Sequence, residues 1–221
     1  MPAPLSQAIG DYLKAIYTLA QRERPVTTTG LAAHLRVAPA SVTNMVKRLT
    51  RLRLVTHTPY RAVGLTVGGE RVALEIIRHH RLLELFLREH LGLSLDQVHR
   101  EAEELEHVLS EEVESRIAAM LGEPTADPHG DPIPTKEGAM AQTAHPRLVD
   151  LQPGDGGRVA RVSDENPRRL RRLTTLGLVP GANVQILHRE ATGGLAVMSQ
   201  GRRRRISAHL AQAVFVAPTP T

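Results

Sequence analysis

The chain has 221 residues, of which 41% are hydrophobic and 2% aromatic, and its formal net charge is +5. This composition predicts a globular protein of two or three small domains with a mostly aliphatic core. Cysteine is absent, which excludes disulfides and thiolate metal ligands. No apolar run is long enough to cross a bilayer, and the first residues lack a signal-peptide pattern, so we expect a cytoplasmic protein with no membrane partner.

Charge is distributed in blocks along the chain. No acidic residue occurs between Glu23 and Glu70, a stretch that holds Lys47 and several arginines. The middle of the chain is acidic, and the last third is basic again, with four consecutive arginines at 202–205. Separate blocks of opposite charge predict one surface for a polyanion and another for cations.

The basic N-terminal segment predicts a chain of helices followed by a hairpin. Residues 7–23 repeat apolar residues at helical spacing, a threonine cap precedes a short helix within 27–35, and another helix follows within 36–55. Residues 56–69 supply two short extended stretches around a turn. This order is typical of a winged helix-turn-helix. The buried stripe of the helix within 36–55 is predicted to be Val42, Met45, Val46, Leu49 and Leu52.

That helix also offers the contacts expected of a DNA-reading element. Small and polar residues near its start would reach base edges, and the cations would neutralise phosphates. A generic three-helix bundle with a solvated cationic face is the alternative; the lack of acidic residues favours double-stranded DNA, bound by a symmetric dimer. The predicted DNA contacts are Ala38, Pro39, Ala40, Ser41, Thr43, Asn44, Lys47, Arg48, Arg51 and Arg61.

Two longer helical segments follow. Residues 94–121 begin at a serine cap and are expected to break or be capped again at Ser110. Both segments hold more apolar residues than two helices need for each other, which favours a homodimer interface. Residues 69–93 predict one long helix whose inward-facing residues are Val72, Ile76, Ile77, Leu83 and Leu87.

Residues that ligate metals gather at helical spacing in these segments. One set combines two imidazoles and a carboxylate, and a second combines two carboxylates and an imidazole; without thiolates, both suit Mn²⁺ or Fe²⁺, although Zn²⁺ and Co²⁺ would also bind. Taken singly, each of these His and Glu residues is better interpreted as part of a solvent-exposed helix face than as a metal ligand. Carboxylates crowded on one face repel unless a cation relieves them, which favours a metal site. The sets are His80, Glu84 and His99, then Glu103, Glu106 and His107, with His99 and the second set expected on one helical face.

The remaining chain predicts a linker and a small β-barrel. Residues 123–155 are rich in Pro, Gly and Thr and lack helical periodicity. Short strand-like runs then alternate with turns as far as residue 218. The arginines at 202–205 are either a second nucleic-acid patch or alternate residues of an exposed strand, and we favour the strand.

Six motifs in order resemble the diphtheria toxin repressor family of metal-dependent bacterial transcription regulators. They are DYLKAIYTL, SVTNMVKRL, GLTVGGE, HHRLLELFL, VHREAEELEHVLSEEVE and PHGDPIP, spread from Asp11 to Pro134. The resemblance implies a mainly α fold with a small β domain: a winged helix-turn-helix over 1–72, a helical metal-binding and dimerisation domain over 73–143, and an SH3-like domain over 144–221. It further implies a homodimer that binds operator DNA with metal and represses metal-uptake genes, without a small-molecule substrate or catalytic residues.

The same resemblance implies two metal sites per subunit. The primary site would be Asp11, Glu103, Glu106 and His107. The ancillary site would be His80, Glu84 and His99, completed from the SH3-like domain by Asp164 or Glu165. Iron-sensing members have Met and Cys in place of Asp11 and Glu103, so the hard ligands here resemble the manganese branch and point to Mn²⁺ ahead of Fe²⁺. Short manganese members have Glu in place of Lys14, and a lysine cation cannot ligate a metal.

Two other functions stay open at this point. A winged-helix protein that binds DNA without metal would carry the same basic segment. A di-metal hydrolase would carry a similar cluster of His and Glu, but a nucleophile motif is missing and the basic segment would be unexplained. DNA binding with and without metal separates the first alternative, and turnover of phosphoesters would reveal the second.

Overall fold

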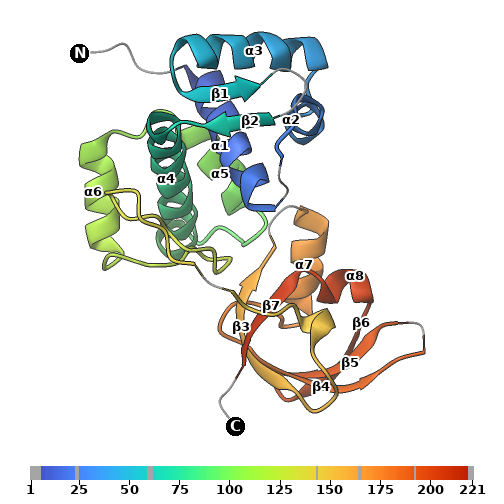
Figure 1. Ribbon diagram of the computed structural model, residues 1–221. Helices are drawn as coiled ribbons and strands as arrows, with labels where there is room; N and C mark the ends of the chain where they lie inside the picture. The colour runs from blue at the N-terminus through green and yellow to red at the C-terminus, as the bar shows by residue number, and fades with distance from the viewer. Residues whose placement is uncertain are drawn as a thin grey trace. The chain divides into compact units, whose positions relative to one another are not determined.

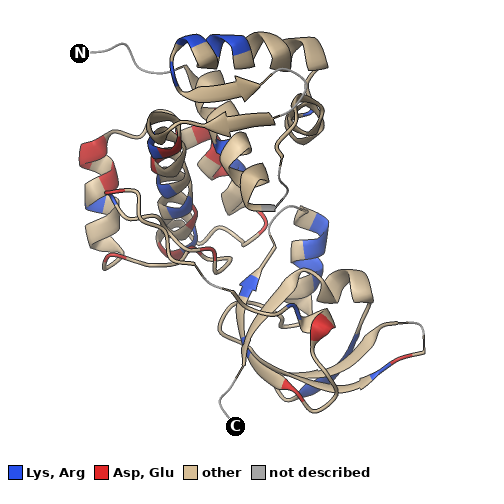
Figure 2. Ribbon diagram, viewed as in Figure 1, with Lys and Arg blue, Asp and Glu red and all other residues tan. Residues whose placement is uncertain are grey.

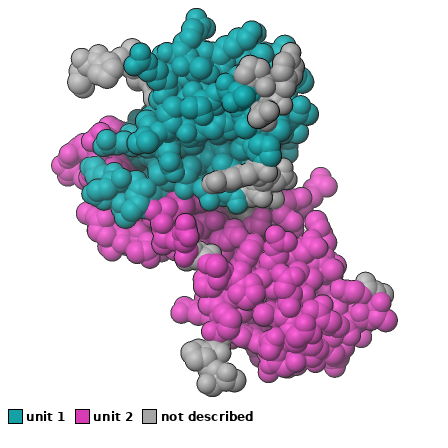
Figure 3. Space-filling view, viewed as in Figure 1, with its two compact units in different colours: residues 1–79, 106–109, 134–139 teal, residues 80–105, 110–133, 140–221 magenta. Residues whose placement is uncertain are grey.

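The chain forms two compact units in a computed structural model, shown in Figures 1 and 3. The structure describes residues 6–22, 25–58, 62–142, 144–163, 166–191 and 193–218. One unit comprises residues 1–79, 106–109 and 134–139, and the other comprises 80–105, 110–133 and 140–221. None of the helices in the described ranges is long and apolar enough to cross a membrane. The three domain boundaries set out above stay a prediction.

The first unit contains three helices and a two-stranded hairpin, as predicted for a winged helix-turn-helix (Figure 1). The hairpin strands are antiparallel, with Val55 opposite Leu65. The predicted DNA contact Arg61 lies outside the described residues. The elements are α1 (Gln7–Arg22), α2 (Thr28–Leu35), α3 (Pro39–Arg51), β1 (Val55–Thr58) and β2 (Ala62–Leu65).

Local signals set the ends of α2 and α3. Thr27 caps α2 because its Oγ1 accepts a hydrogen bond from Gly30 N at 3.0 Å. Pro39 occupies the first turn of α3, where its missing N–H costs nothing. The predicted stripe of α3 is buried at Val42, Val46 and Leu49 and partly buried at Met45. The prediction for Leu52 is wrong: it is 47% exposed because α3 ends at Arg51 and Leu52 is its C-cap.

The long helix α4 (Val67–Leu91) contributes its first residues, as far as His79, to the first unit and the rest to the second. Thr66 caps it: its Oγ1 accepts from Gly69 N at 3.1 Å and donates to Arg53 O at 2.8 Å. Of the residues predicted to face inward, Ile77, Leu83 and Leu87 are buried, whereas Val72 and Ile76 are only partly buried.

Two short helices, α5 (Val98–Leu105) and α6 (Glu111–Met120), follow in the second unit. Ser110 caps α6 by accepting from Val113 N at 3.4 Å, so the predicted break is confirmed. The expectation that Glu106 and His107 share a helical face with His99 is wrong. The helix ends at Leu105, and residues 106–109 turn away into the first unit.

The second unit also holds an antiparallel five-stranded sheet in the order β6-β5-β4-β3-β7. A mainly α protein with a small SH3-like β domain is thus confirmed. Helix α7 was not predicted, although Leu170 and Leu173 stand three residues apart and are both buried. Three of the arginines at 202–205 are exposed on the edge strand β6, as favoured above. The elements are η1 (Leu148–Asp150), β3 (Gly156–Val162), α7 (Pro167–Thr175), β4 (Asn183–Arg189), β5 (Leu195–Ser199), β6 (Arg202–Ile206), α8 (Ala208–Ala211) and β7 (Val214–Pro218).

Candidate metal centres and nucleic-acid interface

Helix α3 presents its predicted DNA-contacting side chains to solvent. Every one of those on Ala38 to Arg51 is exposed, and Figure 2 shows the Lys and Arg residues of α3 in its C-terminal half. Lys47, Arg48 and Arg51 form no ion pair with another described residue, so their charges are available to an anion. A hollow lined by Lys47, Thr50, Arg51 and His57 joins α3 to strand β1. A cationic helix with small residues at its start is suited to a DNA groove.

A first cluster of metal-ligating groups, Asp11, Glu106 and His107, lies in the first unit. Asp11 comes from α1, and the other two come from the turn after α5. Asp11 Oδ1 lies 2.8 Å from His107 Nε2, which lies 3.4 Å from Glu106 Oε1. The Glu106 side chain is 1% exposed and that of Asp11 is 41% exposed. Two carboxylates and an imidazole therefore converge on a half-open position.

Three neighbours shape this first cluster. Lys14 Nζ donates to Glu106 Oε2 at 2.9 Å, and His79 Nδ1 lies 3.3 Å from the Glu106 backbone oxygen. Gly10 permits the close approach of α1, because a Cβ there would lie 3.1 Å from His107 Cε1. Sequence reasoning missed His79 and Gly10, since neither residue type nor spacing marks them as part of a site.

The Asp11 carboxyl holds its proton more tightly than usual. Burial raises the pKa of Asp11, the charge and hydrogen bond of His107 oppose that rise, and the Glu106 charge adds to it. Two carboxylates close together resist ionising together, so a cation is favoured between them.

A second cluster, His80, Glu84 and His99, lies in the second unit. His80 Nε2 lies 3.0 Å from both Glu84 Oε1 and His99 Nδ1, and His99 Nδ1 lies 3.1 Å from Glu84 Oε1. Glu84 is fully buried and His80 is 5% exposed. Glu103 belongs to this unit, where its Oε1 lies 3.4 Å from His99 Nε2. The three ligand atoms form a nearly equilateral triangle.

The segment predicted to be a linker adds two more groups to the second cluster. Asp127 and His129 are buried, and with Glu84 they form a further group of potential ligands. Asp127 Oδ1 accepts hydrogen bonds from His129 N at 2.8 Å and Asp131 N at 2.9 Å, which folds the segment into a tight loop. Residues 127–133 are therefore not an open linker. Only the run PHGDPIP, through the resemblance, pointed to this part of the chain.

The donor set of the second cluster fits a divalent metal. His129 Nε2 donates to Leu95 O at 3.0 Å, which directs the other ring nitrogen, Nδ1, toward Glu84 Oε2, 3.3 Å away. Both of these atoms are buried, and both are of types that ligate divalent metals. Neighbouring ligands of an octahedral ion with bonds of about 2.1 Å lie about 3.0 Å apart. The triangle around His80 has that spacing.

Charges inside the second cluster are balanced by the histidines. Burial alone would raise the pKa of Glu84, but the His80 charge and hydrogen bonds from His129, His80 and His99 hold it well below its usual value. Burial raises the pKa of Asp127 well above its usual value, helped by the charges of Glu84 and Asp131. Glu84 is thus the more readily ionised of the two carboxylates.

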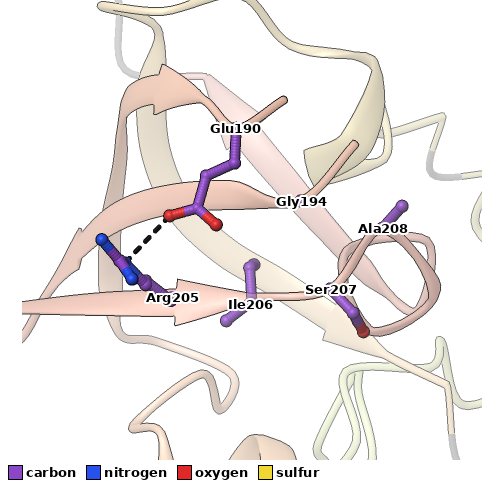
Figure 4. A pocket seen from close by; sticks show the side chains of 6 residues that line it. All are labelled: Glu190, Gly194, Arg205, Ile206, Ser207 and Ala208. Carbon is purple, nitrogen blue, oxygen red and sulfur yellow. Dashed lines mark ion pairs between the residues drawn. The ribbon is translucent and has the colours of Figure 1, made fainter. Parts of the chain in front are cut away.

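The two predicted ligands of the SH3-like domain, Asp164 and Glu165, lie outside the described residues. A pocket on the same domain is lined by Glu190, Gly194, Arg205 and Ser207, among others (Figure 4). Glu190 Oε1 and Arg205 Nε are 3.0 Å apart there, so the two charges satisfy each other.

Comparison with known proteins gives three matches to family models along the chain. The models are described as the N-terminal DNA binding domain of iron dependent repressors over residues 4–63, their metal binding and dimerisation domain over 66–135, and the FeoA domain over 147–218. The matches cover both metal clusters and helix α3.

Individual relatives agree. The chain is 31% identical over 215 residues to the diphtheria toxin repressor of Corynebacterium efficiens, covering 93% of each chain. It is 42% identical over 118 residues to an uncharacterized HTH-type transcriptional regulator of Methanocaldococcus jannaschii, covering 53% of this chain and 94% of the relative. A solved manganese-dependent transcriptional repressor in complex with manganese superposes with a TM-score of 0.88 at 37% identity, covering 97% of this chain and all of the other.

Proposed function

The chain belongs to the iron-dependent repressor family, which includes the diphtheria toxin repressor, and from this premise we propose a Mn²⁺-dependent repressor with two metal centres per subunit. Members of the family are DNA-binding regulators and not enzymes. The choice of metal is supported by one observation: all ligand atoms in both clusters are nitrogen or oxygen, and cysteine is absent. Such hard sets favour Mn²⁺, with Fe²⁺ next. A solved relative is described as manganese-dependent.

We assign Asp11, Glu106 and His107 to the first centre; Glu103, which the resemblance placed there, belongs to the other unit and lies 3.4 Å from His99. The second centre comprises His80, Glu84 and His99, with Asp127 and His129 beside them; Asp164 and Glu165 stay further candidates. A bound cation would supply positive charge among carboxylates that otherwise repel. Glu84 would offer it a carboxylate whose pKa is held low, and His129 would offer Nδ1 once that nitrogen carries no proton, because its other nitrogen donates to Leu95 O.

The first centre is suited to control DNA binding. Asp11 lies on α1, whose buried Leu13 and Ile16 share a hydrophobic core with Val42 and Val46 of α3. Ligation of Asp11 together with Glu106 and His107 fixes α1, and through that core it fixes the DNA-reading helix. Two half-sites read by a dimer need fixed spacing, so the immobilised state binds operator DNA more tightly. A coupling of about 1–3 kcal/mol is usual for such linkage, and DNA must tighten metal binding equally.

The proposal is tested by DNA binding of purified protein to genomic fragments with Mn²⁺, Fe²⁺, Zn²⁺ or a chelator. We expect binding with Mn²⁺ and its loss in chelator. Glu106→Ala should abolish the metal response, whereas Glu112→Ala, which removes an exposed glutamate paired with Arg116, should preserve it. Equal binding in chelator would instead support a metal-independent regulator. A Glu106→Ala protein that keeps the Mn²⁺ response with an unchanged midpoint would show that this centre is not the sensor.

A further inference from the structure

The side chain of Lys14 pairs with the buried carboxylate of Glu106 in the first candidate metal centre. Lys14 lies three residues after Asp11 on α1, and its Nζ donates to both oxygens of Glu106, at 3.0 Å to Oε1 and 2.9 Å to Oε2. The Glu106 side chain is 1% exposed, whereas that of Lys14 is 22% exposed. A candidate metal ligand, almost completely buried, is therefore engaged at both oxygens by a cation of the protein itself.

Among the described residues, no lysine or arginine pairs with Glu84 of the second centre, although Arg81 Nε lies 3.6 Å from the neighbouring Asp127 Oδ2. Glu84 is just as buried, but the ion pairs that reach it within the described ranges come from His80, His99 and His129. These rings are themselves potential ligands, and neutral imidazole does not repel a metal ion. The two centres thus differ in a permanent positive charge, present at Glu106 and absent at Glu84.

We propose that Lys14 is an internal competitor for metal at the Asp11 centre, an inference that rests on the proposed function. Without metal it neutralises Glu106, a buried carboxylate in the same cluster as the carboxylate of Asp11. A metal ion that takes the Glu106 oxygens must displace the ammonium group, which remains attached nearby and repels it. The flexible, part-exposed stem lets the group swing toward solvent. Lys14 therefore raises the metal concentration at which the Asp11 centre fills, and the His80 centre fills first.

The test is a Mn²⁺ titration of the full-length protein in which calorimetry measures the affinity. All variants carry His80→Ala, so that the Asp11 centre is titrated alone. Adding Lys14→Met should tighten Mn²⁺ binding about tenfold or more, because a unit charge a few ångströms away is removed. The same change should lower the metal-free unfolding temperature and enlarge its rise on adding Mn²⁺. Lys14→Arg keeps the charge and should titrate like the parent. Arg116→Met removes a cation from the exposed pair with Glu112 and should change neither quantity.

Unchanged Mn²⁺ affinity in Lys14→Met would overturn the inference, as would equally tight binding in Lys14→Arg and Lys14→Met. If Lys14→Met fails to fold without metal, Lys14→Gln carries the same expectation with a polar side chain. Glu106→Ala in the same background separates the two proposals. If Glu106→Ala loses Mn²⁺ binding but Lys14→Met has no effect, only the proposal that Lys14 competes with metal is refuted. Full Mn²⁺ binding in Glu106→Ala refutes the assignment of the centre itself.

Discussion

At the scale of residues, the candidate ligands are oriented by neighbours that are not ligands. His79 lies against the backbone oxygen of Glu106, and Leu95 O fixes the ring of His129. Each contact limits which ring nitrogen or carboxylate oxygen faces the centre, and such outer contacts commonly change metal affinity by 10–100-fold. Metal affinity should therefore respond to residues that are not themselves ligands, some of which, such as Leu95 and Gly10, a search for His, Asp and Glu would not select.

Gly10→Ala should weaken the first centre without unfolding the protein. The new Cβ would lie 2.8 Å from Ile76 Cδ1 and 3.1 Å from His107 Cε1, so the imidazole must shift. We expect Mn²⁺ affinity to fall about tenfold. The gain of about 1 kcal/mol in helix propensity offsets much of the packing cost. Calorimetry and thermal unfolding measure the two effects, and a loss of stability with unchanged metal affinity would contradict the expectation.

At the scale of elements, α3 carries the proposed DNA-binding surface and the start of α4 supports it. Thr66 links the two, since its hydroxyl caps α4 and donates to Arg53 O just after α3. Gly69 lies in the first turn of α4, where a Cβ would stand 1.9 Å from Leu54 O. No side chain can move aside there, because the obstacle is backbone. The close approach of α4 to the segment after α3 therefore requires glycine.

Gly69→Ala should destabilise the DNA-binding unit severely, by about 3 kcal/mol or more, because overpacking against backbone forces the helix to move. Gly68→Ala is the matched control: its Cβ would meet only Thr66 Oγ1 at 3.9 Å. That variant should match or exceed the parent in thermal unfolding, since alanine is the better helix former. Equal stability of the two variants would contradict the packing described here.

Two kinds of contact are expected from α3. Arg48→Ala should weaken binding to all DNA sequences and reduce its salt dependence, because it removes a phosphate contact, whereas Asn44→Ala should relax preference at particular base pairs. Binding titrations at several salt concentrations with matched and mismatched operators distinguish the two effects. An Arg48→Ala protein with parental affinity and salt slope would rule out this docking of α3.

Sequence periodicity predicted the helices that bury an apolar stripe, and it failed where the determinant is tertiary. The charged pattern of 98–117 continues beyond Leu105, but the chain turns there so that Glu106 meets His79 and Lys14. Likewise, Asp127 and His129 sit in a stretch whose Pro and Gly content is typical of linkers. Their role follows from a fold in which Glu84 lies beside them. Spacing identifies neighbours along a helix, but not partners brought together by packing.

At the scale of the whole molecule, residues 127–131 connect the second candidate metal centre to the SH3-like sheet. Val162 N of β3 donates to His129 O at 2.9 Å, and Arg161 Nη1 lies 3.4 Å from Asp131 Oδ1. Gly130 has φ 89°, and a Cβ there would stand 2.0 Å from Ala160 O. The loop that carries a candidate ligand is therefore held directly on a strand of the β domain.

Gly130→Ala should impair the second centre. The clash with β3 moves His129 away from Glu84, so Mn²⁺ affinity should fall about tenfold in the Glu106→Ala background, and thermal stability should fall with it. Gly154→Ala, at φ 95° with open space around its Cβ, shares the backbone strain but not the clash. It should keep parental Mn²⁺ affinity. If both variants bind Mn²⁺ alike, contact with β3 does not position His129.

Leu95 makes the helical part of the second unit depend on the β domain. The side chain belongs to the helical part of the second unit, yet it is 3% exposed within the hydrophobic core of the β domain. Deleting the β domain would expose the Leu95 side chain to water. It would also remove the hydrogen bond that Val162 N donates to the His129 carbonyl. The relative from Methanocaldococcus jannaschii matches only 53% of this chain while using 94% of its own length. A form of this protein without the β domain would therefore need substitutions at the residues that lose their contacts with that domain. The first of these would replace Leu95 with a polar residue.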